Sequence, residues 1–168
     1  MTERLAVYAG SFDPPTVGHL WMIEEGASLF DRLWVAIGVN PEKKSLLGVE
    51  PRLEMLRDIT SDLPNIKVGV FTHQYLIRYA KEIGARFILR GIRSETDYEY
   101  ERGMRNINGD FDPSITTVFL MPPRGIAEVS SSLVKAVIGP EGWEEVVKRY
   151  VPEPVFQRIV RFRHGANA

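Results

Sequence analysis

The chain has 168 residues, a length that suits one globular domain, because two half-sized cores would each be marginally stable. Hydrophobic residues make up 44% and charged residues 26%, and the formal net charge of −1 gives no electrostatic reason to expect a nucleic acid or an anionic membrane as a partner. The absence of cysteine excludes disulfides, thiolate chemistry and zinc–cysteine sites, and the absence of a long apolar stretch leads us to expect a soluble, cytoplasmic protein.

Apolar runs of strand length alternate with segments of helical periodicity along the whole chain. In chain order we predict a strand at 5–9, a helix at 18–30, a strand at 33–39, a helix that begins at Pro51, a strand at 66–71, a helix at 75–83, a strand at 86–89, a helix at 96–108, a strand at 115–121 and a helix at 130–138. A Gly-Pro-Glu-Gly turn at 139–142 precedes a helical tail.

This alternation predicts an α/β fold in which five parallel strands form one sheet with helices on both faces. We expect a single Rossmann-like domain over residues 1–168, with residues 139–168 as a helical C-terminal extension. Ligands bind beyond the carboxyl ends of the strands in such sheets. The loops that follow the first, second, fourth and fifth strands are therefore the candidate site.

The loop after the first strand has the sequence Gly-Ser-Phe-Asp-Pro-Pro-Thr-Val-Gly-His, from Gly10 to His19. Gly18 removes a side chain where a helix begins, so that a phosphate can approach the backbone N–H groups there. His19 follows in the first helical turn. A lone histidine is more often structural, and a glycine-rich turn alone is weak evidence, but together between a strand and a helix they favour a phosphate site.

The three later loops contain cations and hydroxyl groups. Lys43 and Lys44 follow the second strand, Arg90 and Arg93 flank Gly91-Ile92 after the fourth strand, and three consecutive serines begin a helix at Ser130. Solvated surface charges and a serine cap are the simpler explanations for each loop taken alone. Arranged at one edge of a sheet, the same groups could bind an anion.

The four loops together resemble the phosphopantetheine adenylyltransferase family of the nucleotidyltransferase superfamily. The superfamily signature is His or Thr, any residue, Gly, His, which corresponds to Thr16–His19 in this chain. The run from Arg90 to Glu101 is similar to the family pattern Arg-Gly-(apolar)-Arg-x-x-x-Asp-(aromatic)-Glu-(aromatic)-Glu, and the Ser-Ser-Ser run also matches. The resemblance extends from Val7 to about Ile138.

The resemblance to this family implies a role for each matching residue. The nucleotide, ATP, is expected to contact Ser11, Phe12, His19, Gly91, Ile92, Arg93, Glu101, Ile126, Ser130, Ser131 and Ser132. The acceptor, 4′-phosphopantetheine, is expected to contact Ser11, Lys43, Leu76 and Arg90. His19, Lys43 and Arg93 are the candidate catalytic residues. Asp97 and Glu99 could equally be carboxylates that stabilise the start of a helix, with no ligand.

The implied reaction is attack by the acceptor phosphate on the α-phosphorus of ATP with release of pyrophosphate. The resemblance also implies magnesium bound mainly through the ATP phosphates, with no dedicated metal site in the protein, and a homohexamer. Another acceptor, such as nicotinate mononucleotide or a glycerol phosphate, and a catalytically silent nucleotide-binding module remain alternatives. Ile126 and Glu128 depart from the family, which usually has aromatic residues at these two positions.

Overall fold

The structure is a computed structural model that describes residues 3–40, 42 and 44–165. Five strands form one sheet: β1 (Leu5–Gly10), β2 (Arg32–Val39), β3 (Ile66–Thr72), β4 (Phe87–Gly91) and β5 (Thr116–Leu120). They lie in the order β3-β2-β1-β4-β5, and every neighbouring pair is parallel. The predicted parallel sheet is confirmed, and the first strand lies at its centre, where the strand order reverses direction.

The first five helices alternate with the strands. These are α1 (Val17–Leu29), α2 (Val49–Ile59), α3 (Leu76–Glu82), α4 (Glu95–Phe111) and α5 (Ser131–Val137). Side chains of β1 alternate between two cores: Ala6 and Tyr8 pack with residues of α1 and α2, whereas Leu5 and Val7 pack with residues of α3. Both faces of the sheet are therefore covered, which explains why the strands are apolar along most of their length.

The predicted boundaries differ from the structure by one to three residues, and two of these differences have a clear physical reason. Helix α2 begins at Val49, with Gly48 as its N-cap, so Pro51 is the third helical residue. Proline is tolerated throughout the first turn because the N–H groups there have no partner within the helix. Strand β4 continues to Gly91, and Arg90 pairs in register with Phe119 of β5. A charged residue can occupy this strand position because protein groups bind its guanidinium, as described below.

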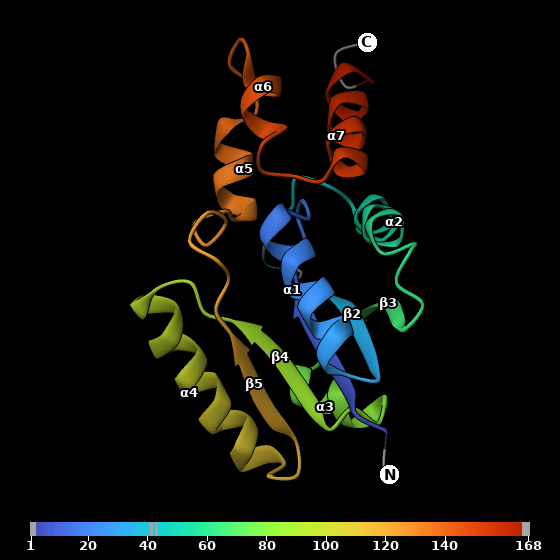
Figure 1. Ribbon diagram of the computed structural model, residues 1–168, viewed down its shortest axis with the longest axis vertical. Helices are drawn as coiled ribbons and strands as arrows, with labels where there is room; N and C mark the ends of the chain where they lie inside the picture. The colour runs from blue at the N-terminus through green and yellow to red at the C-terminus, as the bar shows by residue number, and fades with distance from the viewer. Residues whose placement is uncertain (1–2, 41, 43, 166–168) are drawn as a thin grey trace.

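The C-terminal tail forms two helices, α6 (Trp143–Val147) and α7 (Glu153–Gly165). They lie with α5 at the end of the molecule toward which β4 and β5 point (Figure 1). Val147, Val155 and Ile159 of the tail share a third apolar core with Met55 of α2 and Val134 of α5.

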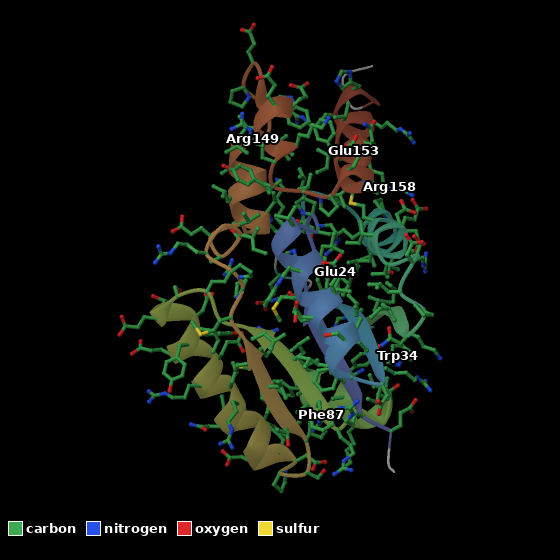
Figure 2. The ribbon with its side chains drawn as sticks, in the orientation of Figure 1. Glu24, Trp34, Phe87, Arg149, Glu153 and Arg158 are labelled. Carbon is green, nitrogen blue, oxygen red and sulfur yellow. The ribbon has the colours of Figure 1, made fainter. Side chains whose placement is uncertain are left out.

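Polar contacts reinforce this attachment of the tail. Arg158 of α7, which is labelled in Figure 2, forms ion pairs with Glu54 and Asp58 of α2. The backbone carbonyl of Tyr150, which lies between α6 and α7, accepts a hydrogen bond from the N–H of Val17 at 3.0 Å. Because Val17 is the first residue of α1, the tail is joined directly to the segment that carries the Gly-His motif. No helix in the described part of the chain has the length and apolar character to span a bilayer.

Candidate active site

A polar cavity of about 280 Å³ lies at the carboxyl ends of the central strands. Helix α1, strand β4, helix α4 and the start of α5 all contribute to its lining. The predicted residues that line it are Ser11, His19, Arg90, Gly91, Arg93, Glu101, Ile126, Ser130, Ser131 and Ser132. The fold thus brings together side chains that are up to 121 positions apart in the sequence, as Ser11 and Ser132 are.

The start of α1 fixes the orientation of His19. Thr16 is the N-cap, and its hydroxyl accepts a hydrogen bond from the backbone N–H of His19 at 3.3 Å. In return, Nδ1 of His19 accepts a hydrogen bond from the backbone N–H of Thr16 at 3.0 Å. This reciprocal pair is a capping box in which histidine takes the place usually filled by glutamate or glutamine. The threonine of the sequence motif therefore positions the histidine.

The capping box also determines the protonation of the ring. A backbone N–H can only donate, so Nδ1 must be the unprotonated nitrogen and Nε2 carries the proton. Burial, assisted by the positive charge of Arg93, lowers the pKa of His19 to about 4. The ring is thus neutral at physiological pH and offers Nε2–H to a ligand in the cavity that it lines. The ring can therefore act as a neutral hydrogen-bond donor to phosphate oxygens, but not as a cation.

The Phe12 ring packs against the imidazole ring of His19. Its side chain is fully buried, and its ring centroid lies 5.0 Å from that of His19 and 5.5 Å from that of Tyr8, both in edge-on arrangements. The backbone of Phe12 has a φ of 46°, in the left-handed region that non-glycine residues seldom adopt. The Phe12 ring lies outside the described lining of the cavity, and the expected nucleotide contact of this residue stays a prediction. Ile92 is likewise buried, and its N–H donates to the carbonyl of Leu120.

Asp13 is a buried carboxylate that joins three segments of the site. Its two oxygens accept hydrogen bonds from the backbone N–H groups of Leu46 and Leu47, at 2.8 and 2.9 Å, and one of them accepts from Lys135 Nζ of α5 at 3.2 Å. The segment after β2, the first loop and α5 are therefore tied to one side chain. Lys43, the predicted catalytic and acceptor-binding lysine, lies outside the described residues.

Two of the three serine hydroxyl groups at the start of α5 form hydrogen bonds within the protein. Ser130 caps α5 by accepting a hydrogen bond from the N–H of Leu133, and Ser131 donates to the carbonyl of Pro14 at 2.8 Å. The capping explanation is thus correct for Ser130, although its side chain also lines the cavity. Ser131 fixes α5 against the first loop, which leaves the hydroxyl of Ser132 as the most available of the three.

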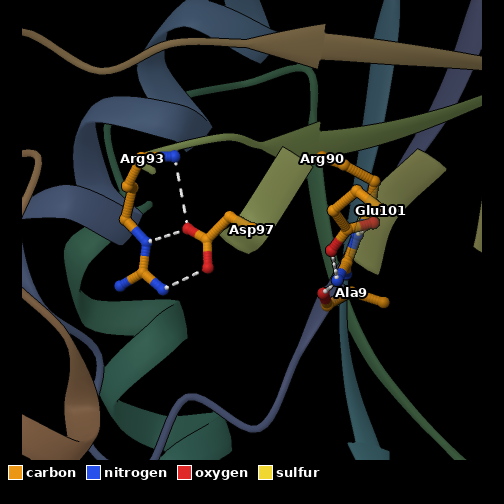
Figure 3. A network of polar contacts seen from close by, with 5 residues as sticks. All are labelled: Ala9, Arg90, Arg93, Asp97 and Glu101. Atoms are coloured by element: carbon orange, nitrogen blue, oxygen red, sulfur yellow. Dashed lines mark hydrogen bonds and ion pairs between the residues drawn. The ribbon is translucent and has the colours of Figure 1, made fainter. Parts of the chain in front are cut away.

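Arg90 of β4 and Arg93 of the loop that follows are paired with carboxylates of α4 (Figure 3). Arg93 Nε lies 2.9 Å from Oδ2 of Asp97, one turn into the helix. Arg90 Nε lies 2.9 Å from Oε2 of Glu101, its second terminal nitrogen pairs with Oε1, and its first donates to the carbonyl of Ala9 at 2.9 Å. Burial opposes the charge of Arg90, but the hydrogen bond and charge of Glu101 outweigh it and raise the pKa of the guanidinium.

A second, mainly apolar cavity of about 470 Å³ adjoins the first. It lies between α3 and α4, and its lining includes Leu76, the residue predicted to contact the acceptor, together with Phe71 and Met104. Ala9, Gly10, Arg90 and Glu101 line both cavities and therefore form the boundary between them. The exposed Glu128 lies outside the described lining of either cavity, and Lys135 pairs with Asp13 rather than with Glu128.

Sequence reasoning did not identify Tyr8 and Asp13 as site residues. Tyr8 was assigned only to a buried strand, but its side chain also reaches the polar cavity, where burial raises the pKa of its hydroxyl to about 12 and keeps it protonated. Asp13 lies in the loop from Gly10 to His19, and its position between an aromatic residue and two prolines was the available signal that it has buried partners.

Comparisons with known proteins agree with this geometry. Residues 7–137 match the cytidylyltransferase-like family model. The chain is 60% identical to the phosphopantetheine adenylyltransferase of Neisseria meningitidis over 166 residues, which cover 99% of this chain and 98% of that protein. It is 56% identical to the same enzyme of Chromobacterium violaceum over 94% of this chain and 96% of that one. A solved nicotinic acid mononucleotide adenylyltransferase of Plasmodium falciparum, in complex with NaAD, superposes with a TM-score of 0.73 over 96% of both chains at 18% identity, a likeness of fold.

Proposed function

Because the chain belongs to the phosphopantetheine adenylyltransferase family, we propose that it transfers AMP from ATP to 4′-phosphopantetheine, giving dephospho-coenzyme A and pyrophosphate. An oxygen of the acceptor phosphate forms the new bond to the α-phosphorus. The bond from that phosphorus to the bridging oxygen breaks, and pyrophosphate leaves with the electron pair. The chemistry requires no protein nucleophile, so catalysis consists of positioning and charge stabilisation.

The observation that carries this proposal is the pair of cavities that meet at Arg90. A triphosphate needs hydrogen-bond donors for its phosphate oxygens. In the polar cavity His19, Arg93 and the start of α5 supply such donors. The apolar cavity beside Leu76 suits the pantetheine arm, which is long and largely uncharged. An acceptor whose arm fills the apolar cavity would have its phosphate at the boundary, next to the α-phosphate of ATP.

Within this proposal, the site residues act on different parts of the two substrates. His19 donates Nε2–H to the phosphate oxygens on which charge develops, and as a preorganised neutral group it needs no proton transfer to do so. Arg93 binds the triphosphate, together with Ser11 and the serines at the start of α5. Arg90 and Lys43 bind the attacking phosphate. Ile126 covers the adenine by apolar contact in place of the family's usual aromatic residue.

Magnesium fits the site as an ion carried by the nucleotide. Among the described residues, no group of three or more His, Cys, Asp or Glu side chains is arranged to hold a metal. The two carboxylates that line the polar cavity, Asp97 and Glu101, are each engaged by an arginine. Phosphate oxygens would therefore supply most of the ligands. Bound magnesium would neutralise charge on the triphosphate, as it does in other nucleotide sites.

We further propose a cytoplasmic homohexamer, as the resemblance of the sequence implies. Large apolar side chains are exposed at the N-cap of α3 and on α4, including Tyr75, Ile107 and Phe111, which also line the apolar cavity. Burial of such a surface favours self-association. Light scattering of the purified protein tests the assembly: a monomer at micromolar concentration would contradict it.

The experiment that tests the activity is acceptor-dependent release of pyrophosphate from ATP in the presence of magnesium. Phosphopantetheine, nicotinate mononucleotide and glycerol phosphate are compared at equal concentration, with ATP alone as the blank. We expect turnover with phosphopantetheine to exceed turnover with the other two by orders of magnitude. Preference for another acceptor would overturn the assignment, and absence of turnover with all three would support a silent nucleotide-binding module.

A further inference from the structure

Arg52 of α2 is a buried cation that contacts the first loop, and its residue is only 4% exposed. Its Nη1 donates a hydrogen bond to the carbonyl of Ser11 at 2.7 Å, and its Nε donates to the carbonyl of Gly48 at 3.1 Å. Ser11 lines the polar cavity, whereas Arg52 lies outside the described lining of that cavity. The guanidinium therefore reaches the site through the backbone of the first loop.

The charge of this arginine has no direct ion-pair partner in the described part of the chain. The carboxylate that acts on it by charge is Asp13, which is itself paired with Lys135. Burial outweighs the attraction of Asp13 and lowers the pKa of the Arg52 guanidinium. A buried cation that is bound by carbonyls costs free energy, and a well-packed apolar side chain in such a place is often no less stable. Stability alone is thus a weak reason for an arginine at this position.

The hydrogen bond from Arg52 fixes the peptide that joins Ser11 to Phe12. Phe12 has a φ of 46°, and strained backbone of this kind persists only where its surroundings hold it. The peptide is trans, so the N–H of Phe12 points away from the carbonyl that binds Arg52. Among the backbone hydrogen bonds of the described residues, none occupies this N–H. Arg52 therefore holds a strained turn in which one peptide N–H is free.

We propose that Arg52 is a positioning residue: by binding the Ser11 carbonyl, it holds the first loop in the conformation that presents the Ser11 hydroxyl and the Phe12 N–H to the substrate phosphates. This inference rests on the proposed function, since it takes transfer of AMP as the reaction. Preorganised donors stabilise the charge that develops on phosphate oxygens in the transition state. Because a displacement of about 1 Å can cost about a hundredfold in rate, loss of Arg52 should lower kcat more than it raises either KM.

The test is Arg52→Met, which keeps an apolar stem but removes both hydrogen bonds. We expect kcat to fall about ten- to a hundredfold, with the KM values for ATP and phosphopantetheine changed less than about threefold. Arg57→Met is the control for charge. Arg57 is exposed on the same helix, where it pairs with Glu50, so its removal should leave kcat unchanged.

Ile159→Ala is the control for stability. Ile159 is buried in α7, and it belongs to the apolar core that α7 shares with α2. The cavity left by this variant should lower the melting temperature, as the loss of Arg52 also should, but it does not touch the first loop. At a temperature where the variant is folded, its kcat should therefore equal that of the wild type. Circular dichroism during heating gives the melting temperature of each protein.

Two results of this comparison would overturn the inference. A wild-type kcat in Arg52→Met, together with a lowered melting temperature, would make Arg52 a purely structural residue. A fall in kcat of the same size in Ile159→Ala would show that any loosening of α2 slows the enzyme, without a specific role for the bond to Ser11.

Arg52→Lys separates orientation from charge, and it also decides the question if Arg52→Met does not fold. An ammonium group keeps the charge but lacks the planar fork that binds two carbonyls at once. We expect kcat to fall by about fivefold or more in this variant, the scale of losing one hydrogen bond from a charged group. A wild-type kcat would show that charge alone is required and would overturn the inference. Failure of the proposed function is a separate result: the wild-type protein would then release no pyrophosphate with phosphopantetheine, whatever the variants do.

Discussion

Helix α4 holds two arginine–carboxylate pairs one turn apart, and they differ mainly in burial. In the pair of Arg90 and Glu101, the side chains are 26% and 9% exposed, and Arg90 also donates a hydrogen bond to the Ala9 carbonyl. In the pair of Arg93 and Asp97, the side chains are 40% and 28% exposed. Solvent screens the second pair and can replace its hydrogen bonds, whereas breaking the first would leave a buried charge without a partner.

This difference matches the tasks that we propose for the two arginines. The acceptor phosphate must be held still for attack, which favours the buried, doubly anchored Arg90. The triphosphate changes its charge distribution, and its β- and γ-phosphates then leave as pyrophosphate. This favours Arg93, because a partly exposed side chain can exchange Asp97 for a phosphate and back again. One helix thus supplies a rigid and an adaptable cation to neighbouring substrates.

The largest effect is expected from His19, which lies beside Arg93 but belongs to neither pair. His19→Ala should lower kcat by about two to four orders of magnitude, because it removes a preorganised donor to the phosphate oxygens. The KM for ATP should change much less. Steady-state kinetics decides this, with circular dichroism to verify the fold, and a variant that keeps a near wild-type kcat would refute the role.

The next effect separates the two arginines by substrate. Arg90→Met should raise the KM for phosphopantetheine by roughly ten- to a hundredfold and leave the KM for ATP nearly constant, whereas Arg93→Met should do the reverse. Methionine keeps the apolar stem of each side chain, so the loss is that of the guanidinium. If one variant raised the KM values for both substrates equally, the two arginines would not bind different substrates as we propose.

The titration of His19 gives an independent test of the influence of Arg93 on the polar cavity. Burial lowers the pKa of His19 to about 4, and the positive charge of Arg93 contributes to this lowering. We therefore expect Arg93→Met to move this pKa from about 4 part of the way toward its ordinary value of about 6.5, and Arg90→Met to leave it in place. Nitrogen-15 NMR of the imidazole measures it, with His19→Ala to assign the signal. A shift in Arg90→Met alone would contradict the comparison.

The same pKa predicts the direction of one contribution to acid stability. The unfolded chain binds a proton at His19 near pH 6.5, and the folded protein does so only near pH 4. The free energy of unfolding should therefore fall as the pH drops from about 6.5 to about 4, with no further loss from this residue below that. Chemical denaturation of the wild type and of His19→Ala across this range should show a shallower slope in the variant.

The smallest effect is expected from the exposed carboxylate. Asp97→Asn should change the KM for ATP by less than about threefold, and added salt should reduce the difference further, because partly exposed ion pairs contribute little and are screened. Measurement of KM at low and at high ionic strength tests this. A salt-independent change of tenfold or more would mean that Asp97 holds Arg93 as firmly as Glu101 holds Arg90.

The sequence predicted the order and type of the first ten elements because periodicity reports local burial directly. Strands that are apolar at successive positions and helices with a three- to four-residue repeat both appear in the structure at the expected places. The parallel sheet follows from the alternation, since a helix between two strands returns the chain to the same end of the sheet. The boundaries differ at Pro51, which lies within the first turn of α2 instead of at its start, and at Arg90, a charged residue that pairs within β4 instead of following it.

The family and most residues of the site were also readable from the sequence, because four motifs follow four strands whose carboxyl ends must lie at one edge of the sheet. Only the tertiary structure decided what each side chain contacts. The buried Phe12 ring, the engagement of Asp13 by α5 and the pairing of Glu101 with Arg90 all depend on residues that are distant in sequence. Sequence motifs specify which groups are present in a site, whereas packing determines which of them are free to bind a ligand and which hold the others in place.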